Sequence, residues 1–274
     1  NSNNGIIRTT EASGTVNGTE TVGGLIAVNN GTVRNSTVSS SITGEFSVGG
    51  IVGDNEVAGD IRNTTASGRI TATGDIASNI GGLVGVSDGT VQNATALGNV
   101  IAPTADEVGG LVGEHNGGII QNTVAAGNVS GNRTVGGLVG RNNNGTIRET
   151  FAVGSVSGST GVGGLVGNNT GFDGAGTVID SYWDTEATDQ GNSAGFAENL
   201  TTDEMQGSAA EDNMEGFDFG VVWQTQTNPD DYPTLIALQE TQPGGDTGGG
   251  AQPPASVTFN NRTVPRGSST ITID

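Results

Sequence analysis

The chain has 274 residues, of which 32% are hydrophobic and 4% aromatic, while 49 are glycine and none is cysteine. This composition excludes a disulfide framework and thiol chemistry, and it is too poor in large apolar side chains for a conventional globular core. The net charge of −20 comes from 29 acids against nine bases, all of them arginine. Because such a surface repels phosphate, we expect no nucleic-acid partner.

High acidity without lysine is typical of proteins from very salty habitats, where screening over about 3 Å or less weakens the repulsion between acidic side chains. We therefore expect a halophilic source and a fold that is most stable in molar salt. No apolar run approaches the ~18 residues of a membrane-spanning helix, so we expect no membrane insertion in this segment.

A hexapeptide of small apolar residues recurs through the first 170 residues. "VGGLVG" occurs at 108–113, 135–140 and 162–167, and variants begin at Val22, Val48 and Ile80. The steps between successive copies are 26, 32, 28, 27 and 27 residues. A second segment, of the type "TVRNSTVSSSITG" at 32–44, keeps the same period. Repeats of 20–50 residues are typical of solenoids, propellers and arrays.

Each unit predicts three short strands, I-x-N-x-x-A, G-x-V-x-G and V-G-G-L-V-G, separated by glycine, asparagine or serine turns. Units of about 27 residues are too short for propeller blades, which favours an all-β solenoid of six to seven coils. The hexapeptide is then a structural strand of the solenoid and not a phosphate-binding loop, because it lacks the strand–turn–helix setting and the lysine of such a loop. Three apolar columns should line the core: Ile7, Val33, Ile61, Val91, Ile120, Ile147 and Val178; Ala12, Val38, Ala66, Ala96, Ala125 and Ala152; and Val16, Ile42, Ile70, Val100, Val129 and Val156.

These repeats resemble the GLUG motif, named for its Gly-Leu-apolar-Gly core and found in large secreted and surface proteins of bacteria and archaea, including adhesin-like proteins. The resemblance covers about residues 3–170, and "SYWDTEATDQG", "LTTDEMQG", "FDFGVVWQ" and "DYPTLIAL" resemble the segment that closes such arrays. It implies a surface-exposed adhesive or scaffolding role and supplies no defined catalytic residues.

The chain divides into four expected parts: repeats at 1–170, a C-terminal cap at 171–238, a Gly/Pro-rich linker at 239–256, and a strand segment at 257–274. The last part resembles the start of a β-sandwich domain of haloarchaeal surface proteins. Within the cap, "TTDEMQ" predicts a helix start capped by Thr202 or Asp203. The first coil begins at once, so either another copy's tail or cap covers it, or residues upstream supply a cap.

Few residues are candidates for chemistry. His115, the sole histidine, is expected to be a solvated corner residue, which leaves no metal site or triad based on histidine. Asp184, Glu186 and Asp189 beside Trp183 could hold a sugar on an aromatic platform; alternatively the acids are solvated and the tryptophan closes the core. We predict no catalytic residue, no metal ligand and no cofactor, with Ca²⁺ at these acids left as an alternative.

A polar column follows the first apolar column. It contains Arg8, Arg34, Arg62, Gln92, Gln121 and Arg148. If these side chains face outward they form a stripe for anions or acidic glycans, unless the arginines pair locally with acids such as Asp60. The next column, of Asn35, Asn63, Asn93 and Asn122, is either an inward asparagine ladder at a corner or an outward row that includes glycan acceptors.

Asn-x-Ser/Thr sequons are abundant and favour a secreted glycoprotein. The candidate acceptors are Asn17, Asn30, Asn35, Asn63, Asn93, Asn128, Asn132, Asn144, Asn168, Asn199 and Asn261.

Together these patterns predict a non-enzymatic, extracellular cell-surface protein that acts as an adhesin, a stalk or a filament subunit. Its expected partners are other copies of itself or other surface proteins, and acidic glycans. The alternative is a carbohydrate-binding or carbohydrate-cleaving module on a β-helix, with Trp183 and the arginine column in contact with the glycan.

Overall fold

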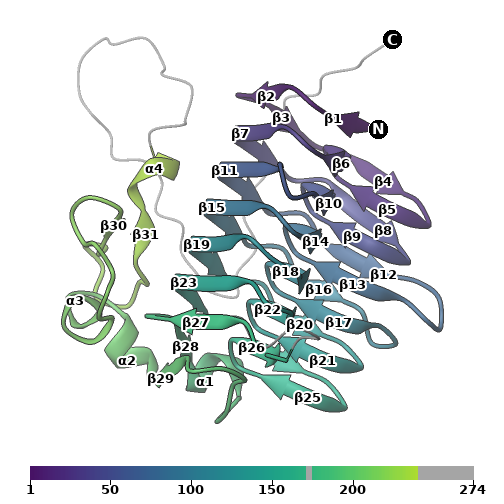
Figure 1. The fold of residues 1–274 in the computed structure, drawn as a ribbon. Helices are drawn as coiled ribbons and strands as arrows, with labels where there is room; N and C mark the ends of the chain where they lie inside the picture. Colours follow the sequence, from purple (N-terminus) through teal and green to yellow (C-terminus); the bar gives the residue numbers. More distant parts are fainter. Residues whose placement is uncertain (171–174, 240–274) are drawn as a thin grey trace, which may run out of the picture.

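The computed structural model describes residues 1–170 and 175–239, and their strands stack into a β-solenoid (Figure 1). The predicted fold class is therefore confirmed. The segment predicted as strands at 257–274, nearly all of the predicted linker, and the sequon at Asn261 lie outside the described residues.

Each coil of the described solenoid has four faces, not the three that the sequence predicted, because the hexapeptide is divided between two strands. Its glycine pair forms the corner: a side chain at Gly49 would overlap the carbonyl oxygen of Val52, and one at Gly50 would overlap that of Gly82 in the next coil. Only glycine allows the backbone to approach itself this closely. Within a coil the chain visits faces 1 to 4 in order.

The faces are parallel sheets whose strands follow one another from coil to coil. Face 1 contains β2 (Ile6–Arg8), β3 (Glu11–Ala12), β7 (Thr32–Val38), β11 (Asp60–Ala66), β15 (Thr90–Ala96), β19 (Ile119–Ala125), β23 (Thr146–Ala152), β27 (Thr177–Ile179), β28 (Tyr182–Asp184) and β29 (Glu198–Leu200). Face 2 contains β4 (Thr15–Asn17), β8 (Ser41–Gly44), β12 (Ile70–Ala72), β16 (Val100–Ile101), β20 (Val129–Ser130) and β24 (Val156–Ser157).

The two remaining faces share the glycine corner. Face 3 contains β5 (Glu20–Gly23), β9 (Phe46–Gly49), β13 (Ser78–Gly81), β17 (Asp106–Gly109), β21 (Arg133–Gly136) and β25 (Thr160–Gly163). Face 4 contains β1 (Ser2–Asn3), β6 (Ile26–Asn29), β10 (Val52–Asn55), β14 (Val84–Ser87), β18 (Val112–His115), β22 (Val139–Asn142) and β26 (Val166–Asn168).

The predicted apolar columns are confirmed by the strand register. Ile61 of β11 lies opposite Val33 of β7 and Val91 of β15, and all three side chains are fully buried. The columns of faces 1 and 4 share one core cluster, and those of faces 2 and 3 share a second. Matched side chains at the same height in successive coils therefore provide the core that the overall composition lacks.

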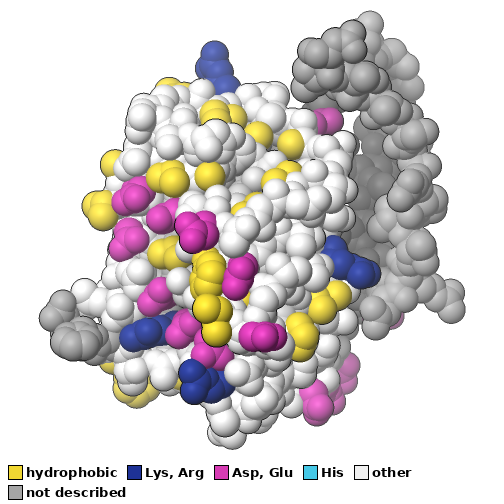
Figure 2. All heavy atoms as spheres, turned by 90° about the vertical axis from the view of Figure 1, so that its right-hand side faces the viewer, with side chains coloured by type: hydrophobic (Ala, Val, Ile, Leu, Met, Phe, Trp, Pro, Cys, Tyr) yellow, Lys and Arg dark blue, Asp and Glu magenta, His cyan; other side chains and the backbone are white. Residues whose placement is uncertain are grey.

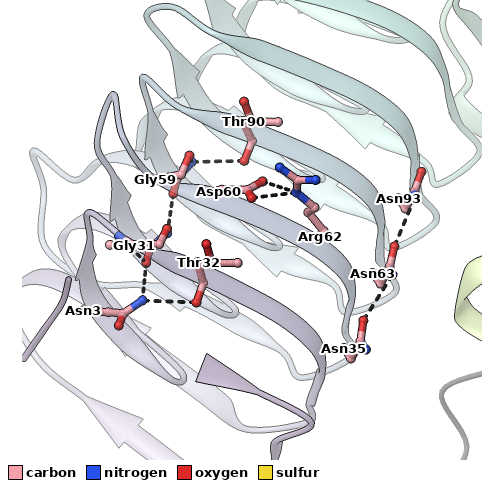
Figure 3. Close-up of polar contacts among 12 residues, drawn as sticks. Asn3, Gly31, Thr32, Asn35, Gly59, Asp60, Arg62, Asn63, Thr90 and Asn93 are labelled. Atoms are coloured by element: carbon pink, nitrogen blue, oxygen red, sulfur yellow. Dashed lines mark hydrogen bonds and ion pairs between the residues drawn. The ribbon is translucent and has the colours of Figure 1, made fainter. Parts of the chain in front are cut away.

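The long strands of face 1 bend at the same position in each coil. Asn35, Asn63, Asn93 and Asn122 stand at the bend with φ between 50° and 52°, a left-handed conformation that asparagine tolerates better than most residues. The Nδ2 of Asn63, Asn93 and Asn122 each donates to the Oδ1 of the asparagine one coil earlier, at 3.0–3.1 Å (Figure 3). Of the two alternatives for this column, the asparagine ladder is the one found.

The segment from Thr177 to Leu200 continues the stack at the far end of the solenoid. β27 and β28 pair with β23, and β29 pairs with β28. The backbone at Asn192 and Ala194 hydrogen-bonds to Gly164 and Val166 of the last full coil. Between these pieces lies the short helix α1 (Thr185–Thr188). This part of the predicted cap therefore lies over the last coil.

The rest of the described chain turns back along the outside of face 1 (Figure 1). It contains α2 (Thr202–Met205), α3 (Ala209–Asn213), β30 (Trp223–Gln224), β31 (Thr234–Leu235) and α4 (Ile236–Gln239), and α4 contacts β11 and β15. Its apolar side chains cluster with Val124 and Phe151 of face 1. The cap of α2 is Thr201, in a capping box with Glu204, so the prediction of Thr202 or Asp203 is wrong by one or two residues.

Candidate functional site

The arginine column is the feature of the surface with the clearest chemistry. Its strands pair in register, so that Arg8, Arg34 and Arg62 occupy equivalent places in three successive coils. All three residues are exposed, which is the outward orientation that the sequence left open. Gln92, Gln121 and Arg148 continue the column toward the other end.

The three exposed arginines differ in whether an acid pairs with them. Arg62 lies 2.6 Å from Asp60, and this hydrogen bond raises the pKa of the guanidinium (Figure 3). In contrast, the ion pairs of the described residues include none for Arg8 or Arg34. The expectation of local pairing with Asp60 therefore holds for Arg62 alone.

Arg148 belongs to a chain of hydrogen-bonded side chains at the other end of the column. It is half-buried, and its Nη2 donates to Oε1 of Gln121 at 2.8 Å. The Nε2 of Gln121 in turn donates to Oε2 of Glu149, also at 2.8 Å. Its Nε is buried without a hydrogen-bond partner in the described chain, so Arg148 is less accessible than the exposed arginines and is a poor candidate for a ligand contact.

Trp183, the aromatic platform that the sequence offered for a sugar, is not accessible on the surface. Trp183 is only 4% exposed, its indole N–H donates to the carbonyl oxygen of Gln190, and its ring packs against Gly164. Assigning Trp183 to glycan contact is therefore wrong, because its ring closes the core at the last coil. This is the other interpretation that the sequence allowed.

Asp184 is fully buried, so the expectation that it is solvated is also wrong. Its Oδ1 accepts from the backbone N–H groups of Glu186 and Ala187 at the start of α1, and its Oδ2 accepts from the hydroxyls of Thr202 and Tyr232. Four donors satisfy the buried carboxylate and tie the end of the solenoid to the segment outside face 1. Glu186 and Asp189 are exposed, as the alternative interpretation predicted.

His115 is the clearest error of the sequence analysis, because it is fully buried rather than solvated. It occupies a polar column inside the corner between faces 4 and 1, at the height of Asn55, Ser87 and Asn142. Its Nδ1 lies 3.2 Å from the carbonyl oxygen of Ser87, and burial lowers its pKa to about 4. The recurrence of asparagine or serine at this position of other coils is the signal that could have indicated a shared polar column in place of a solvated loop.

The ten described sequons differ in how free the acceptor amide is. Asn63 and Asn93 use their Nδ2 in the asparagine ladder, and Asn132 donates to Asp106. Asn35 and Asn168 are half-buried, the latter accepting from its own Thr170. The exposed acceptors are Asn17, Asn30, Asn128, Asn144 and Asn199.

Acidic side chains gather on the side of the solenoid opposite the C-terminal segment, residues 201–239 (Figure 2). Burial, with Glu56 and Asp88 nearby, raises the pKa of Asp54 to about 6. Farther along the solenoid, Arg141 lies within 4.0 Å of both Glu107 and Glu114. No group of three or more potential metal ligands is placed to hold an ion within residues 1–170 and 175–239, so the calcium alternative gains no support there.

No helix of the described chain is both long and apolar enough to cross a membrane.

Three comparisons relate the chain to known proteins. The family model for the GLUG motif matches residues 44–71, which make up one coil. Halomucin of Haloquadratum walsbyi is 39% identical over 87 residues, which are 31% of this chain and 1% of Halomucin. A crystal structure of a putative immunoglobulin A1 protease from Bacteroides ovatus matches with a TM-score of 0.53 and 19% identity, over 85% of this chain and 75% of that one.

This last likeness is one of fold alone. The comparison with Halomucin agrees with the halophilic source that the acidic, lysine-free composition predicted, although the chain matches only a very small part of that protein. The chain is a β-solenoid that carries the GLUG motif, as its repeats indicated.

Proposed function

We propose that this chain is a non-enzymatic scaffold module of an extracellular surface protein, in which the solenoid acts as a rigid spacer. The observation that carries the proposal is the GLUG motif on an unbroken stack of coils, together with the similarity to Halomucin. The exposed sequons and the acidic surface are consistent with life outside a cell in concentrated salt.

Rigidity follows from how the coils are joined. Every full coil is hydrogen-bonded to its neighbours on four faces, and the asparagine ladder adds side-chain bonds along the axis. With about 4.8 Å between coils, six coils give a rod about 30 Å long. Several such modules in one long chain would extend the spacer, and the short match within Halomucin is compatible with that use.

The test of location is labelling of intact cells of the organism that makes the protein. Gold-labelled antibodies against the solenoid should decorate unpermeabilised cells, with a cytoplasmic marker remaining unlabelled. Labelling that requires permeabilisation would contradict the proposal. The same images distinguish an adhesin at contact sites, a stalk, and a filament subunit.

The partners we propose for the scaffold are other copies of the chain or other surface proteins. Sedimentation of the full chain at increasing concentration tests the first of these in molar salt. A sedimentation coefficient that rises with concentration supports self-association, and a constant monomer value contradicts it.

A carbohydrate-binding module is the second candidate, and the exposed arginines favour it over a carbohydrate-cleaving one. Cleavage uses two carboxyl groups about 5–10 Å apart that face a common groove. Of the acids beside Trp183, Asp184 is enclosed by four donors and does not face a groove. Binding of glycans by the arginines is developed below.

A further inference from the structure

Three exposed arginines stand on successive coils of face 1. Arg8 pairs in register with Arg34, and Arg34 with Arg62. Since parallel strands lie about 4.8 Å apart, the three guanidinium groups start from positions at this interval along the solenoid axis. We call Arg8, Arg34 and Arg62 the arginine row.

The row places like charges next to one another in a protein that has acids in excess. Directly opposed like charges destabilise a sheet. Of the other described arginines, Arg133 pairs with Asp106, and Arg141 with Glu107 and Glu114, whereas Arg69 has no ion pair and stands opposite no arginine in the strand register. Within residues 1–170 and 175–239, Arg8 and Arg34 have no such acid. An external anion would supply the missing counter-charge.

We propose that the arginine row binds an acidic polysaccharide that runs along the solenoid axis, with its carboxylate or sulfate groups held by successive guanidinium groups. Guanidinium binds such planar or tetrahedral oxyanions through paired hydrogen bonds. This role goes beyond that of a scaffold and does not depend on it.

The spacing and the salt environment both suit a sparsely charged glycan. Double-stranded DNA carries one charge per ~1.7 Å, far denser than one arginine per ~4.8 Å, and the net charge of −20 repels it. In molar salt the screening length is about 3 Å, so remote acids on the solenoid have little effect. Direct hydrogen bonds of about 2.8 Å lie within that distance and survive.

Asp60 is an internal competitor for the site. It holds Arg62 at 2.6 Å and thereby occupies one of the three guanidinium groups (Figure 3). Thr32 and Thr90 occupy the equivalent place in the neighbouring coils, so a neutral polar residue fits there. Removing the charge of Asp60 should free Arg62 for the ligand.

The experiment measures binding of the full chain to immobilised dextran sulfate, alginate and neutral dextran in 1–3 M NaCl. The sulfated and carboxylated polymers distinguish the two anions, and both should bind better than dextran. Arg34→Gln should weaken binding about five-fold, and the triple change Arg8→Gln, Arg34→Gln, Arg62→Gln should abolish it. Glutamine already occupies this position at Gln92 and Gln121, so the fold accepts it.

Arg69→Gln is the matched control. Arg69 is exposed, has no ion pair among the described residues, and lies next to face 2, so its loss changes the net charge equally. Binding should change less than two-fold, whereas Asp60→Asn should strengthen it. The proposal is overturned if dextran binds as well as the charged polymers, if Arg69→Gln weakens binding as much as Arg34→Gln, or if duplex DNA binds as tightly as the glycans. None of these results bears on cell-surface location.

Discussion

At the bend of face 1, one backbone conformation is imposed on different residues. The position has positive φ in every coil, at Thr9, Asn35, Asn63, Asn93, Asn122, Glu149 and Asp180. Asparagine adopts this conformation readily and also extends the ladder, whereas glutamate adopts it at a cost. The ladder therefore stops at Asn122, whose buried Oδ1 has no hydrogen-bond partner in the described chain.

Glu149→Asn should stabilise the protein by about 1 kcal/mol. The new residue favours positive φ, and its amide can donate to the orphaned Oδ1 of Asn122, which outweighs loss of the contact with Gln121. Chemical denaturation measures the change. Glu149→Gln removes the same charge without the asparagine preference, and an equal gain from it would refute the role of the ladder.

His115 should make the fold sensitive to acid. Its pKa falls from 6.5 to about 4 on folding, because burial disfavours the charged ring. The unfolded chain then binds the proton more readily than the folded one. The stabilisation from neutral, buried His115 is therefore fully present above about pH 6.5, and the free energy of unfolding decreases by roughly 3 kcal/mol as the pH falls toward 4. Melting temperatures across this range provide the measurement.

The comparison for His115 is His115→Asn, since Asn55 and Asn142 occupy the same column. Asp54, with its raised pKa, acts in the opposite sense as the pH falls, so the difference between the two proteins isolates the histidine. The same pH dependence in both would show that His115 does not titrate as inferred.

Sequons should be occupied according to the freedom of their amides. A glycan on Nδ2 leaves that nitrogen a single hydrogen and adds bulk beside it. The Nδ2 of Asn63 and Asn93 already donates within the ladder, whereas Asn17, Asn30 and Asn144 are exposed. Mass spectrometry of glycopeptides from the native protein should find glycan at exposed acceptors and none at the ladder. Full occupancy at Asn63 would mean that modification precedes folding or that the ladder opens.

At the scale of the element, periodicity predicted the columns well but not the corners. Every predicted apolar column lies in register, because a repeat places equivalent residues at equivalent heights. The number of faces was wrong because Gly49 and Gly50 were taken as part of one strand. In the sequence, a pair of glycines indicates only that the backbone can adopt many conformations. The close contact with the neighbouring coil is what identifies the pair as a corner.

The outer side of face 1 carried a signal that sequence analysis missed. One outward column reads Glu11, Thr37, Thr65, Thr95, Val124, Phe151 and Tyr182 along the solenoid. It changes from polar to apolar where the C-terminal segment packs. The repeat units alone could not predict this packing, because the covering residues belong to a non-repeating part of the chain.

Phe151→Thr should release the C-terminal segment while leaving the coils folded. Phe151 is fully buried, and its ring stacks with Tyr232 and lies tilted against Trp223, so its loss should cost roughly 3–5 kcal/mol at this contact. Hydrogen exchange should rise in residues 201–239. Phe46→Thr, on face 3, is the control and should leave exchange there unchanged; unchanged exchange in both variants would contradict the packing role.

At the scale of the whole molecule, the acids are tolerated where salt screens them. The chain carries a net charge of −20, and at Asp54 burial and two neighbouring acids, Glu56 and Asp88, raise the pKa to about 6. Repulsion of this kind acts over about 10 Å in 0.1 M salt and about 3 Å at 1 M. The composition alone predicted that stability depends on salt, whereas the structure was needed to locate the acids that repel one another.

The melting temperature should therefore rise steeply between 0.1 M and 3 M NaCl. Salt also strengthens apolar burial, so the rise by itself does not identify its cause. The triple change Asp54→Asn, Glu56→Gln, Asp88→Asn removes one cluster of repelling carboxylates, and it should raise the melting temperature in 0.1 M NaCl more than in 3 M. If the variant and the parent gain equally from salt, screening of this cluster is not the cause. If neither melting temperature depends on salt, the halophilic interpretation of the acidic surface is wrong.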